Sequence, residues 1–221
     1  METQAINKKF VNILSSGSTG NCEIYNRSIA VDMGIPFSTI KPYLYDLQIV
    51  LLSHIHSDHF NISTIIRLSK ERPLLRFGCG EWLKERLSTI KNVDVYHLNT
   101  WYDYGSFKVS IGRLYHDVEN CFFRIFIKQP DGEYFKIFRA TDTAHLEGIT
   151  ARDYDAYSIE HNYNAETVFE TIANIESRGG FAHQRGSINT HLSEQQTRDF
   201  IFKNRGANSQ VVRLHESSTS L

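Results

Sequence analysis

Apolar and polar positions follow two different periods along this chain, which indicates a mixture of strands and helices. Short apolar runs bounded by turn-forming residues predict strands at residues 10–14, 22–25, 28–32, 49–52, 74–77, 93–96, 107–114, 121–128, 134–140, 154–159 and 210–214. Apolar residues spaced by three and four predict helices at residues 36–44, 61–70, 81–87, 165–177 and 193–203. The pattern therefore predicts a layered α+β fold with β ribbons inside and helices outside.

Two local signals support these boundaries. Pro130-Asp131-Gly132 predicts a hairpin turn between the strands at 121–128 and 134–140. Ser193 and Gln196 have the spacing of a capping box, which marks the start of the last helix.

Composition narrows the class of protein. A chain of 221 residues with 41% hydrophobic residues fits a single domain spanning residues 1–221. The 24 basic and 25 acidic residues nearly cancel, so no overall charge attracts the protein to nucleic acid or a membrane surface. No signal peptide and no membrane-spanning run is recognisable, which predicts a soluble, cytoplasmic protein. Cys22, Cys79 and Cys121 are widely spaced and are interpreted as buried thiols, although a disulfide stays open.

The strongest chemical signal is the segment His54-Ile55-His56-Ser57-Asp58-His59, which follows the apolar run 49–52. Imidazole and carboxylate groups are common ligands of zinc. If the strand continues, His54 and His56 face the same side, because strand side chains repeat every two residues. Asp58 and His59 then lie in a turn, where they can reach a second ion. A polar loop with unrelated histidines is the weaker interpretation.

Three further candidate ligands each follow a predicted strand. His116, Asp142 and His215 come after the strands at 107–114, 134–140 and 210–214. Taken singly, each is as readily explained as a structural residue. Together with the histidine cluster they favour a metal site, because strand ends hold ligands rigidly.

The order of these ligands resembles that of the metallo-β-lactamase superfamily, and Asp32 in Val31-Asp32-Met33-Gly34 matches the superfamily's early Asp-x-Gly element. The resemblance implies a four-layer αββα metallo-β-lactamase-like sandwich with a two-ion centre. It implies that one ion is bound by His54, His56 and His116, that the other is bound by Asp58, His59 and His215, and that Asp142 bridges them. A bridging aspartate is typical of the phosphodiesterase and thioesterase branches, whereas the β-lactam-cleaving branch usually has cysteine there.

Further segments resemble one branch of this superfamily. The loop at residues 15–22 is similar to the opening of the YycJ/WalJ-type exonuclease-like hydrolases, as are segments 160–164, 184–185 and 191–193. Ribonuclease Z and the phage anti-Pycsar cyclic-nucleotide phosphodiesterases are more distantly similar. The glycine-rich loop alone is a weak signal, since a tight hairpin explains it equally well and it lacks the lysine of a nucleotide P-loop.

The resemblance implies hydrolysis of a phosphodiester by a hydroxide that bridges two divalent ions. The ligands suit Zn²⁺, with Mn²⁺ or Fe²⁺ as alternatives. Asp58 and Asp142 are expected to orient the water. By similarity to ribonuclease Z, His191 is expected to act as the general acid and Glu160 to position it. Alternatively, His191 packs at the start of the helix at 193–203.

The role of several other side chains stays open at this stage. His161, His183 and Arg185 either contact phosphate or are surface residues. His145 is a candidate for supporting Asp142, and His97 is assigned no role.

The substrate is expected to be compact. The segment between Asp142 and Glu160 is too short for a tRNA-binding arm, and the net charge of −1 argues against extended duplex binding. We therefore expect a cyclic nucleotide or a single-stranded nucleic-acid end. Alternatives are hydrolysis of a thioester or lactone, or a non-catalytic protein of the same fold that sequesters a nucleotide. A homodimer is left open.

Overall fold

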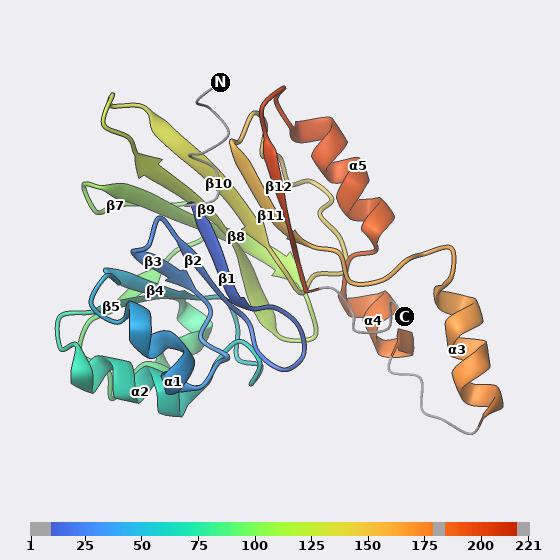
Figure 1. Cartoon of the computed structure of the whole chain (residues 1–221), viewed down its shortest axis with the longest axis horizontal. Coiled ribbons are helices and arrows are strands. Elements are labelled where there is room, and N and C mark those ends of the chain that lie inside the picture. The colour runs from blue at the N-terminus through green and yellow to red at the C-terminus, as the bar shows by residue number, and fades with distance from the viewer. Residues whose placement is uncertain (1–9, 179–183, 216–221) are drawn as a thin grey trace. The chain divides into compact units, whose positions relative to one another are not determined.

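The computed structural model describes residues 10–178 and 184–215. Its internal contacts divide the chain into two units, residues 1–100 and residues 101–221. Each unit contains one six-stranded mixed sheet with its own helices (Figure 1). The α+β class predicted from the sequence is confirmed, whereas a single domain over residues 1–221 stays a prediction.

The sheet of unit 1 has its strands in chain order. They are β1 (Val11–Ser15), β2 (Cys22–Tyr25), β3 (Ile29–Val31), β4 (Ile49–Leu52), β5 (Arg76–Gly80) and β6 (Val93–Tyr96). Strands β1 to β3 pair antiparallel, and β3 to β6 pair parallel. The helices are α1 (Phe37–Ile40) and α2 (Ile62–Glu71), with 3-10 turns at Lys41–Tyr43, Glu81–Leu83 and Glu85–Leu87.

Strand β4 explains why this sheet forms. All four of its residues are apolar and fully buried, as expected for a central parallel strand covered on both faces. Helix α2 packs Ile65 and Leu68 into the same core, and its first turn is capped by Asn61, whose side chain accepts from the Thr64 backbone N–H. Because β3 and β4 are parallel, Asp32 and the loop beginning at Ser53 leave the sheet at the same edge.

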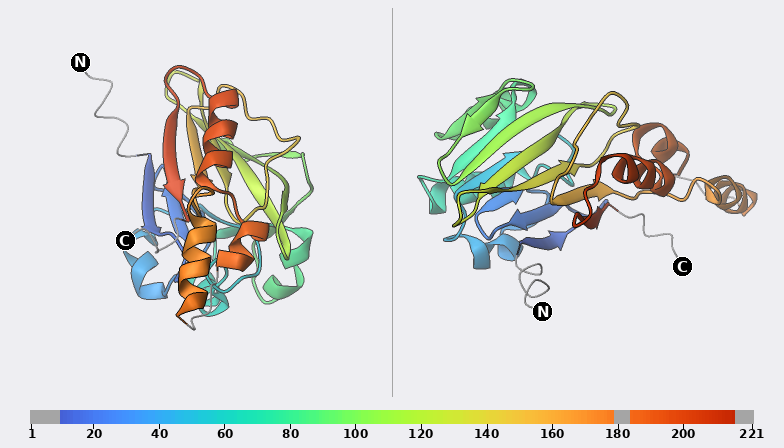
Figure 2. Two further views of the ribbon diagram at one scale, coloured as in Figure 1. Left: turned by 90° about the vertical axis from the view of Figure 1, so that its right-hand side faces the viewer. Right: turned by 90° about the horizontal axis from the view of Figure 1, so that it is seen from above.

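The sheet of unit 2 has the strand order β12-β11-β10-β9-β8-β7. Its strands are β7 (Trp101–Asp103), β8 (Phe107–Tyr115), β9 (Glu119–Lys128), β10 (Tyr134–Ala140), β11 (Ala156–Glu160) and β12 (Gln210–Leu214). Its helices are α3 (Val168–Ser177), α4 (Gln184–Thr190) and α5 (Glu194–Asn204). Helix α5 lies alongside β11 and β12 in both Figure 1 and Figure 2.

Strand directions in unit 2 gather several strand ends at one place. Strands β7 to β10 alternate in direction, and β10, β11 and β12 are parallel. Strands β8, β10, β11 and β12 therefore all end at the same edge, which we call the carboxyl edge. The β9–β10 hairpin turn lies at the opposite edge.

The core of unit 2 forms between this sheet and α5. Phe138, Tyr157 and Ile159 of the sheet pack with Phe200 and Ile201 of α5. The predicted capping box is confirmed, since both of its side-chain hydrogen bonds are present at the start of α5. This helix is therefore fixed in position along the last two strands.

Several sequence predictions need correction. The segment 36–44 forms a single helical turn followed by a 3-10 turn at Pro42, and the segment 81–87 forms two 3-10 turns instead of a helix. Strand β7 and helix α4 were not predicted; β7 has only three residues, and α4 contains a glycine. The condition under which His54 and His56 would share a strand face is not met, because β4 ends at Leu52.

The three cysteines are buried and carry free thiols, as expected. Within residues 10–178 and 184–215, no helix combines the length and the apolar character that crossing a bilayer requires. The cytoplasmic location stays a prediction, as does the homodimer.

Candidate metal centre

The histidine cluster of unit 1 lies in the loop after β4. The chain passes from Leu52 through an irregular stretch into a turn, where Asp58 and His59 lie as predicted. His54 and His59 are fully buried, whereas His56 and Asp58 are partly exposed. The ring centroid of His54 is 4.9 Å from that of His56 and 4.3 Å from that of His59. The loop thus gathers three imidazoles at one point.

Asp32 orients two of these imidazoles. His59 Nδ1 lies 2.7 Å from Asp32 Oδ2; an ionised carboxylate only accepts, so Nδ1 carries the proton. Ser53 Oγ donates to Asp32 Oδ1 at 2.7 Å and lies 2.9 Å from His54 Nδ1, from which it can accept. Both imidazoles therefore have their lone pair on Nε2, and both are held in the way that metal-binding histidines are held.

A second brace comes from the glycine-rich loop. Asn21 Nδ2 lies 3.0 Å from Gly17 O, and 3.2 Å from both Oδ2 and the backbone O of Asp58. It also lies 2.8 Å from His59 Nε2, consistent with a lone pair there. The Asn21 backbone N–H donates to Asp58 O at 2.6 Å. This loop therefore holds the turn in place.

Gly34 allows the turn to approach closely. A Cβ at this position would lie 1.7 Å from Asp58 O and 2.7 Å from His59 N, which real Cβ atoms do not tolerate. The neighbouring Met33 N–H donates to His59 O at 2.8 Å. The Asp-x-Gly element of the sequence therefore acts through the carboxylate of Asp32 and the missing side chain of Gly34.

The other candidate ligands lie at the carboxyl edge of unit 2. His116 follows β8, Asp142 follows β10 and His215 follows β12, as predicted, and Glu160 is the last residue of β11. Asp142 and His215 adopt left-handed backbone conformations, with φ of 58° and 49°. Such conformations are uncommon outside glycine and reverse the chain sharply at the strand end.

Four of these side chains form a compact cluster within unit 2. One ligand atom from each of Asp142, Glu160, His191 and His215 lies within 4.8 Å of the other three. His191 Nδ1 is 2.9 Å from Glu160 Oε2 and 3.2 Å from Asp142 Oδ1. His215 Nδ1 is 3.3 Å from Asp142 Oδ1 and 3.7 Å from Glu160 Oε2. The structure therefore brings His191 next to Glu160, the pair singled out from the sequence.

His116 lies beside this cluster. Its ring centroid is 5.3 Å from that of His191. Its Nδ1 lies 3.0 Å from Thr190 O, and its Nε2 lies 3.1 Å from Asp117 Oδ1. Both ring nitrogens therefore face an oxygen acceptor. Burial lowers the pKa of the imidazole, although the carboxylates of Asp142 and Asp117 act in the opposite direction. A lowered pKa favours the neutral form that can bind a metal ion.

Glu160 is held rigidly and in its charged form. It is fully buried, and its Oε1 accepts from the backbone N–H groups of Thr143 at 2.9 Å and Leu192 at 3.1 Å. Burial by itself would raise the pKa of this carboxyl group, but the hydrogen bond from His191 and the nearby imidazole of His215 outweigh it, and the pKa is lowered. The ionised carboxylate therefore fixes the orientation of the His191 ring.

The remaining candidates have other contacts. His161 is buried, and its Nδ1 donates to Ile159 O at 3.0 Å. The His145 ring stacks on Tyr115 with centroids 4.2 Å apart, and its support of Asp142 stays a prediction. His183 and the side chain of Arg185 lie outside the described residues.

Sequence analysis missed the asparagines that fix the loop backbones. Asn120 Nδ2 donates to Thr141 O at 3.0 Å and to Asp142 O at 2.7 Å. Asn162 Nδ2 lies 3.3 Å from His215 O and also 3.3 Å from His215 Nδ1. A single asparagine has no periodicity or ligand spacing to mark it. For Asn21, the only signal was the similarity of the glycine-rich loop to a family motif.

The donors of each unit fit divalent transition metals. His54, His59 and His116 each direct Nδ1 to an oxygen acceptor of the protein. For His54 and His59 this places the lone pair, through which a neutral imidazole binds an ion, on Nε2. Imidazole together with carboxylate suits Zn²⁺, and Mn²⁺ and Fe²⁺ accept the same ligands. The identity of the metal stays a prediction.

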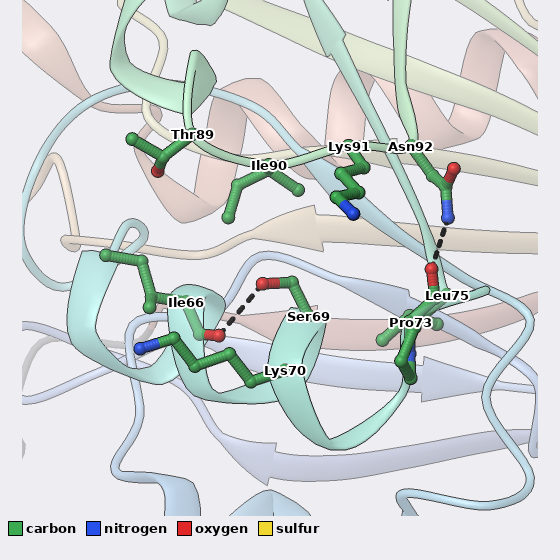
Figure 3. Close-up of a pocket in the computed structure, with 9 residues that line it drawn as sticks. All are labelled: Ile66, Ser69, Lys70, Pro73, Leu75, Thr89, Ile90, Lys91 and Asn92. Carbon is green, nitrogen blue, oxygen red and sulfur yellow. Dashed lines mark hydrogen bonds between the residues drawn. The ribbon is translucent and has the colours of Figure 1, made fainter.

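Unit 1 also contains a cavity of about 520 Å³ (Figure 3). It is lined by Ile66, Ser69, Lys70, Pro73, Leu75, Thr89, Ile90, Lys91 and Asn92. These residues lie in α2 and in the segments that enter β5 and β6, whereas the histidine loop leaves the end of β4. Because β4, β5 and β6 are parallel, the cavity and the histidine loop lie at opposite edges of the sheet.

Comparisons with known proteins give matches in structure only. No family model matches the chain, and no curated protein matches it in sequence. The metallo-β-lactamase fold protein YhfI from Bacillus subtilis is similar with a TM-score of 0.69 and 16% identity, over 96% of this chain and 87% of that one. The short form of human tRNase Z is similar with a TM-score of 0.64 and 14% identity, over 94% and 92% of the two chains. A diphosphatase of the PhnP family is similar with a TM-score of 0.59 and 13% identity, over 94% and 85%.

Proposed function

From the metallo-β-lactamase fold of this chain, which confirms the fold expected from its sequence, we propose that the protein is a metal-dependent phosphodiesterase. The names of two matched structures, a tRNase Z and a diphosphatase, favour a phosphate ester as substrate. The donor types found in each unit support a hydrolase that uses divalent ions.

We propose that the two donor sets act together. In this proposal His54, His56 and His116 would hold one ion, Asp58, His59 and His215 would hold a second, and Asp142 would contribute to both. The support is the order of these residues in the sequence and the orientation of the imidazoles within each unit. When bound, two divalent ions supply a nucleophilic water at neutral pH and polarise a phosphoryl oxygen.

The contact between His191 and Glu160 is the observation that favours hydrolysis of a phosphodiester over hydrolysis of a thioester. An alkoxide leaving a phosphodiester needs a proton, whereas a thiolate or an acidic phenolate needs none. His191 Nδ1 is bound to a buried, ionised carboxylate at 2.9 Å, which stabilises the protonated imidazole and leaves Nε2–H as the donor. As the bond from phosphorus to the leaving oxygen breaks, that oxygen takes the Nε2 proton, and a phosphomonoester and an alcohol are formed.

Asp58 and Asp142 are proposed to orient the attacking water by accepting its hydrogen bonds. The partly exposed carboxylate of Asp58 is fixed by Asn21, and the backbone after β10 is fixed by Asn120. Both acids are therefore held by side chains that take no part in the reaction.

The substrate is proposed to be a small or single-stranded phosphodiester, namely a cyclic nucleotide or a nucleic-acid end. The near-neutral net charge of the chain, −1, favours a substrate with few phosphates over an extended duplex.

The proposal is tested by metal analysis combined with turnover. Purified protein is stripped with a chelator, reloaded with Zn²⁺, Mn²⁺ or Fe²⁺, and assayed on bis-p-nitrophenyl phosphate, cyclic nucleotides and labelled single strands. We expect two bound ions per chain and turnover that is lost in Asp142→Asn. The matched control is His97→Ala, which removes an exposed histidine outside the proposed site and is expected to retain both.

Three other outcomes point elsewhere. Two bound ions without turnover of any phosphodiester, but with tight nucleotide binding, favour the sequestering protein. Turnover of thioesters or lactones alone favours the other hydrolase. A chain that binds no divalent ion contradicts the proposal outright.

A further inference from the structure

A groove in unit 2 lies between α5 and the edge strand β12. It encloses about 520 Å³ and is lined by His161, Arg198, Asp199, Ile201, Phe202, Arg205, Val211 and Arg213. In Figures 1 and 2, α5 lies beside β12. The lining contains three arginines against one aspartate, although the whole chain has a net charge of −1. The lining therefore carries more positive than negative charge, and one of its arginines, Arg198, is ion-paired with Glu194 at 2.9 Å.

Helix α5 supplies four of the eight lining residues, and Arg205 directly follows it. Arg198 and Phe202 are four residues apart, so they lie on the same side of the helix, and Arg205 is the residue that caps its end. All three are exposed, and Phe202 has 84% of its surface accessible. An aromatic ring that is so exposed adds little to the core. Beside guanidinium groups it offers a flat surface on which a nucleobase can stack.

The groove begins at the carboxyl edge. His161 directly follows Glu160, and Arg213 is paired with Ile159 in the sheet, two residues before His215. At about 3.3 Å per residue, the backbones of Arg213 and His215 are roughly 7 Å apart. Helix α5 starts at the same edge, where Thr197 Oγ1 donates to Glu160 O at 2.7 Å. A chain of phosphates that leaves Glu160 and His191 would thus meet Arg213 and Arg198 before reaching Arg205.

We propose that this groove binds the backbone of single-stranded nucleic acid, with Arg198, Arg205 and Arg213 contacting phosphates and Phe202 stacking on a base. The proposal rests on the phosphodiesterase function proposed above and selects a polynucleotide over a cyclic mononucleotide. Arginine suits this role because its planar guanidinium group donates two parallel hydrogen bonds to phosphate. The exposed ring favours nucleic acid over an acidic peptide, because every nucleobase presents a face for stacking.

The experiment measures binding separately from turnover. Fluorescence anisotropy with a labelled 12-nucleotide oligodeoxythymidylate gives the Kd of the wild-type protein, the double variant Arg205→Ala/Arg213→Ala, and Phe202→Ala. We expect the Kd to rise at least about tenfold in the double variant and about fivefold or more in Phe202→Ala. The slope of log K against log salt should fall by about 1.4 in the double variant, or about 0.7 for each lost phosphate contact.

The matched control is Lys70→Ala/Lys91→Ala, which removes two charges from the cavity of unit 1 (Figure 3) and is expected to bind the oligonucleotide like the wild type. Unchanged binding in all groove variants overturns the proposal. The proposal is also overturned if poly-L-glutamate displaces the labelled oligonucleotide as well as unlabelled oligonucleotide does and Phe202→Ala leaves the Kd unchanged. That combination indicates a groove for an acidic peptide. If the wild-type protein hydrolyses no phosphodiester but the groove variants still bind the oligonucleotide more weakly than the wild type, the proposed enzymatic function fails and the groove proposal stands. If turnover is present but the groove variants bind normally, the reverse holds.

Discussion

Replacing Gly34 by alanine tests the physical basis of the histidine loop. The added methyl carbon would lie 1.7 Å from Asp58 O, whereas ordinary contacts begin at 3.4 Å. Either Gly34 or the turn must therefore move by about 1.7 Å, the difference between these two distances. The obstacle is backbone, and it is tied to the Asn21 N–H at 2.6 Å. Overpacking usually costs about 1–3 kcal/mol, and a clash with fixed backbone belongs at or above the upper end of that range.

We therefore expect Gly34→Ala to lower the free energy of unfolding by about 3 kcal/mol or more. For a chain of this size that corresponds to a loss of roughly 6–12 °C in Tm. Because the shift falls on Asp58 and His59, the affinity for Zn²⁺ should fall by about 10-fold to 100-fold, as it does when the support of a metal ligand is removed. Urea unfolding measures the first effect, and competition with a chromophoric chelator measures the second.

The control is Gly186→Ala in α4, where an added Cβ meets nothing within 4 Å. Alanine is the better helix former by about 1 kcal/mol, so this variant should be as stable as the wild type or slightly more so. A Gly34→Ala protein whose unfolding free energy lies within about 0.5 kcal/mol of the wild type, with unchanged Zn²⁺ affinity, would refute the reasoning.

Three further predictions follow from individual contacts. Asp32→Asn keeps a residue type that tolerates the left-handed backbone at this position, φ 57°. It weakens the acceptor of His59 Nδ1, so Zn²⁺ affinity measured by chelator competition should fall by about 10-fold to 100-fold. A variant with the same Zn²⁺ affinity as the wild type would contradict the role of Asp32. Glu160→Gln removes a charge-assisted hydrogen bond worth about 1.5–3 kcal/mol, so hydrolysis of a dinucleotide should slow by about 10-fold to 100-fold. Bis-p-nitrophenyl phosphate should react nearly as before, because its phenolate leaving group needs no proton. Equal losses of rate on both substrates would argue against His191 as the acid. Burial raises the pKa of the Cys79 thiol to about 12, so iodoacetamide at about pH 8 should label it only after unfolding, as read by mass spectrometry. Since the unfolded thiol ionises first, the contribution of Cys79 to stability is present below about pH 9 and is lost as the pH rises toward 12; rapid labelling of the native protein would show the burial to be wrong.

The fold was predictable where burial and periodicity agree. The bounds of β2, β4, β6, β10 and β12 match the sequence prediction, because each is a short apolar run between clear turn residues. The errors lie where propensity is weak. The helix predicted at 36–44 ends after one turn and continues as a 3-10 turn at Pro42, since proline lacks the N–H that a continuing helix needs.

The candidate ligands were found because histidine and aspartate at strand ends leave a visible spacing. Their supports were harder to find. Asn21, Asn120 and Asn162 act through contacts with residues far away in sequence, and no local pattern encodes those contacts. Gly34 is similar, because its importance depends on the backbone of Asp58 lying against it.

The β9–β10 hairpin offers a site for labelling this protein. Strand β10 spans seven residues, so at about 3.3 Å per residue its first residue lies roughly 20 Å from Asp142. Gly132 in the connecting turn has open space around it. A fluorophore inserted there should allow the protein to be followed in solution, and an affinity tag should allow it to be immobilised on a surface. Neither should disturb the loops that contain the candidate metal ligands.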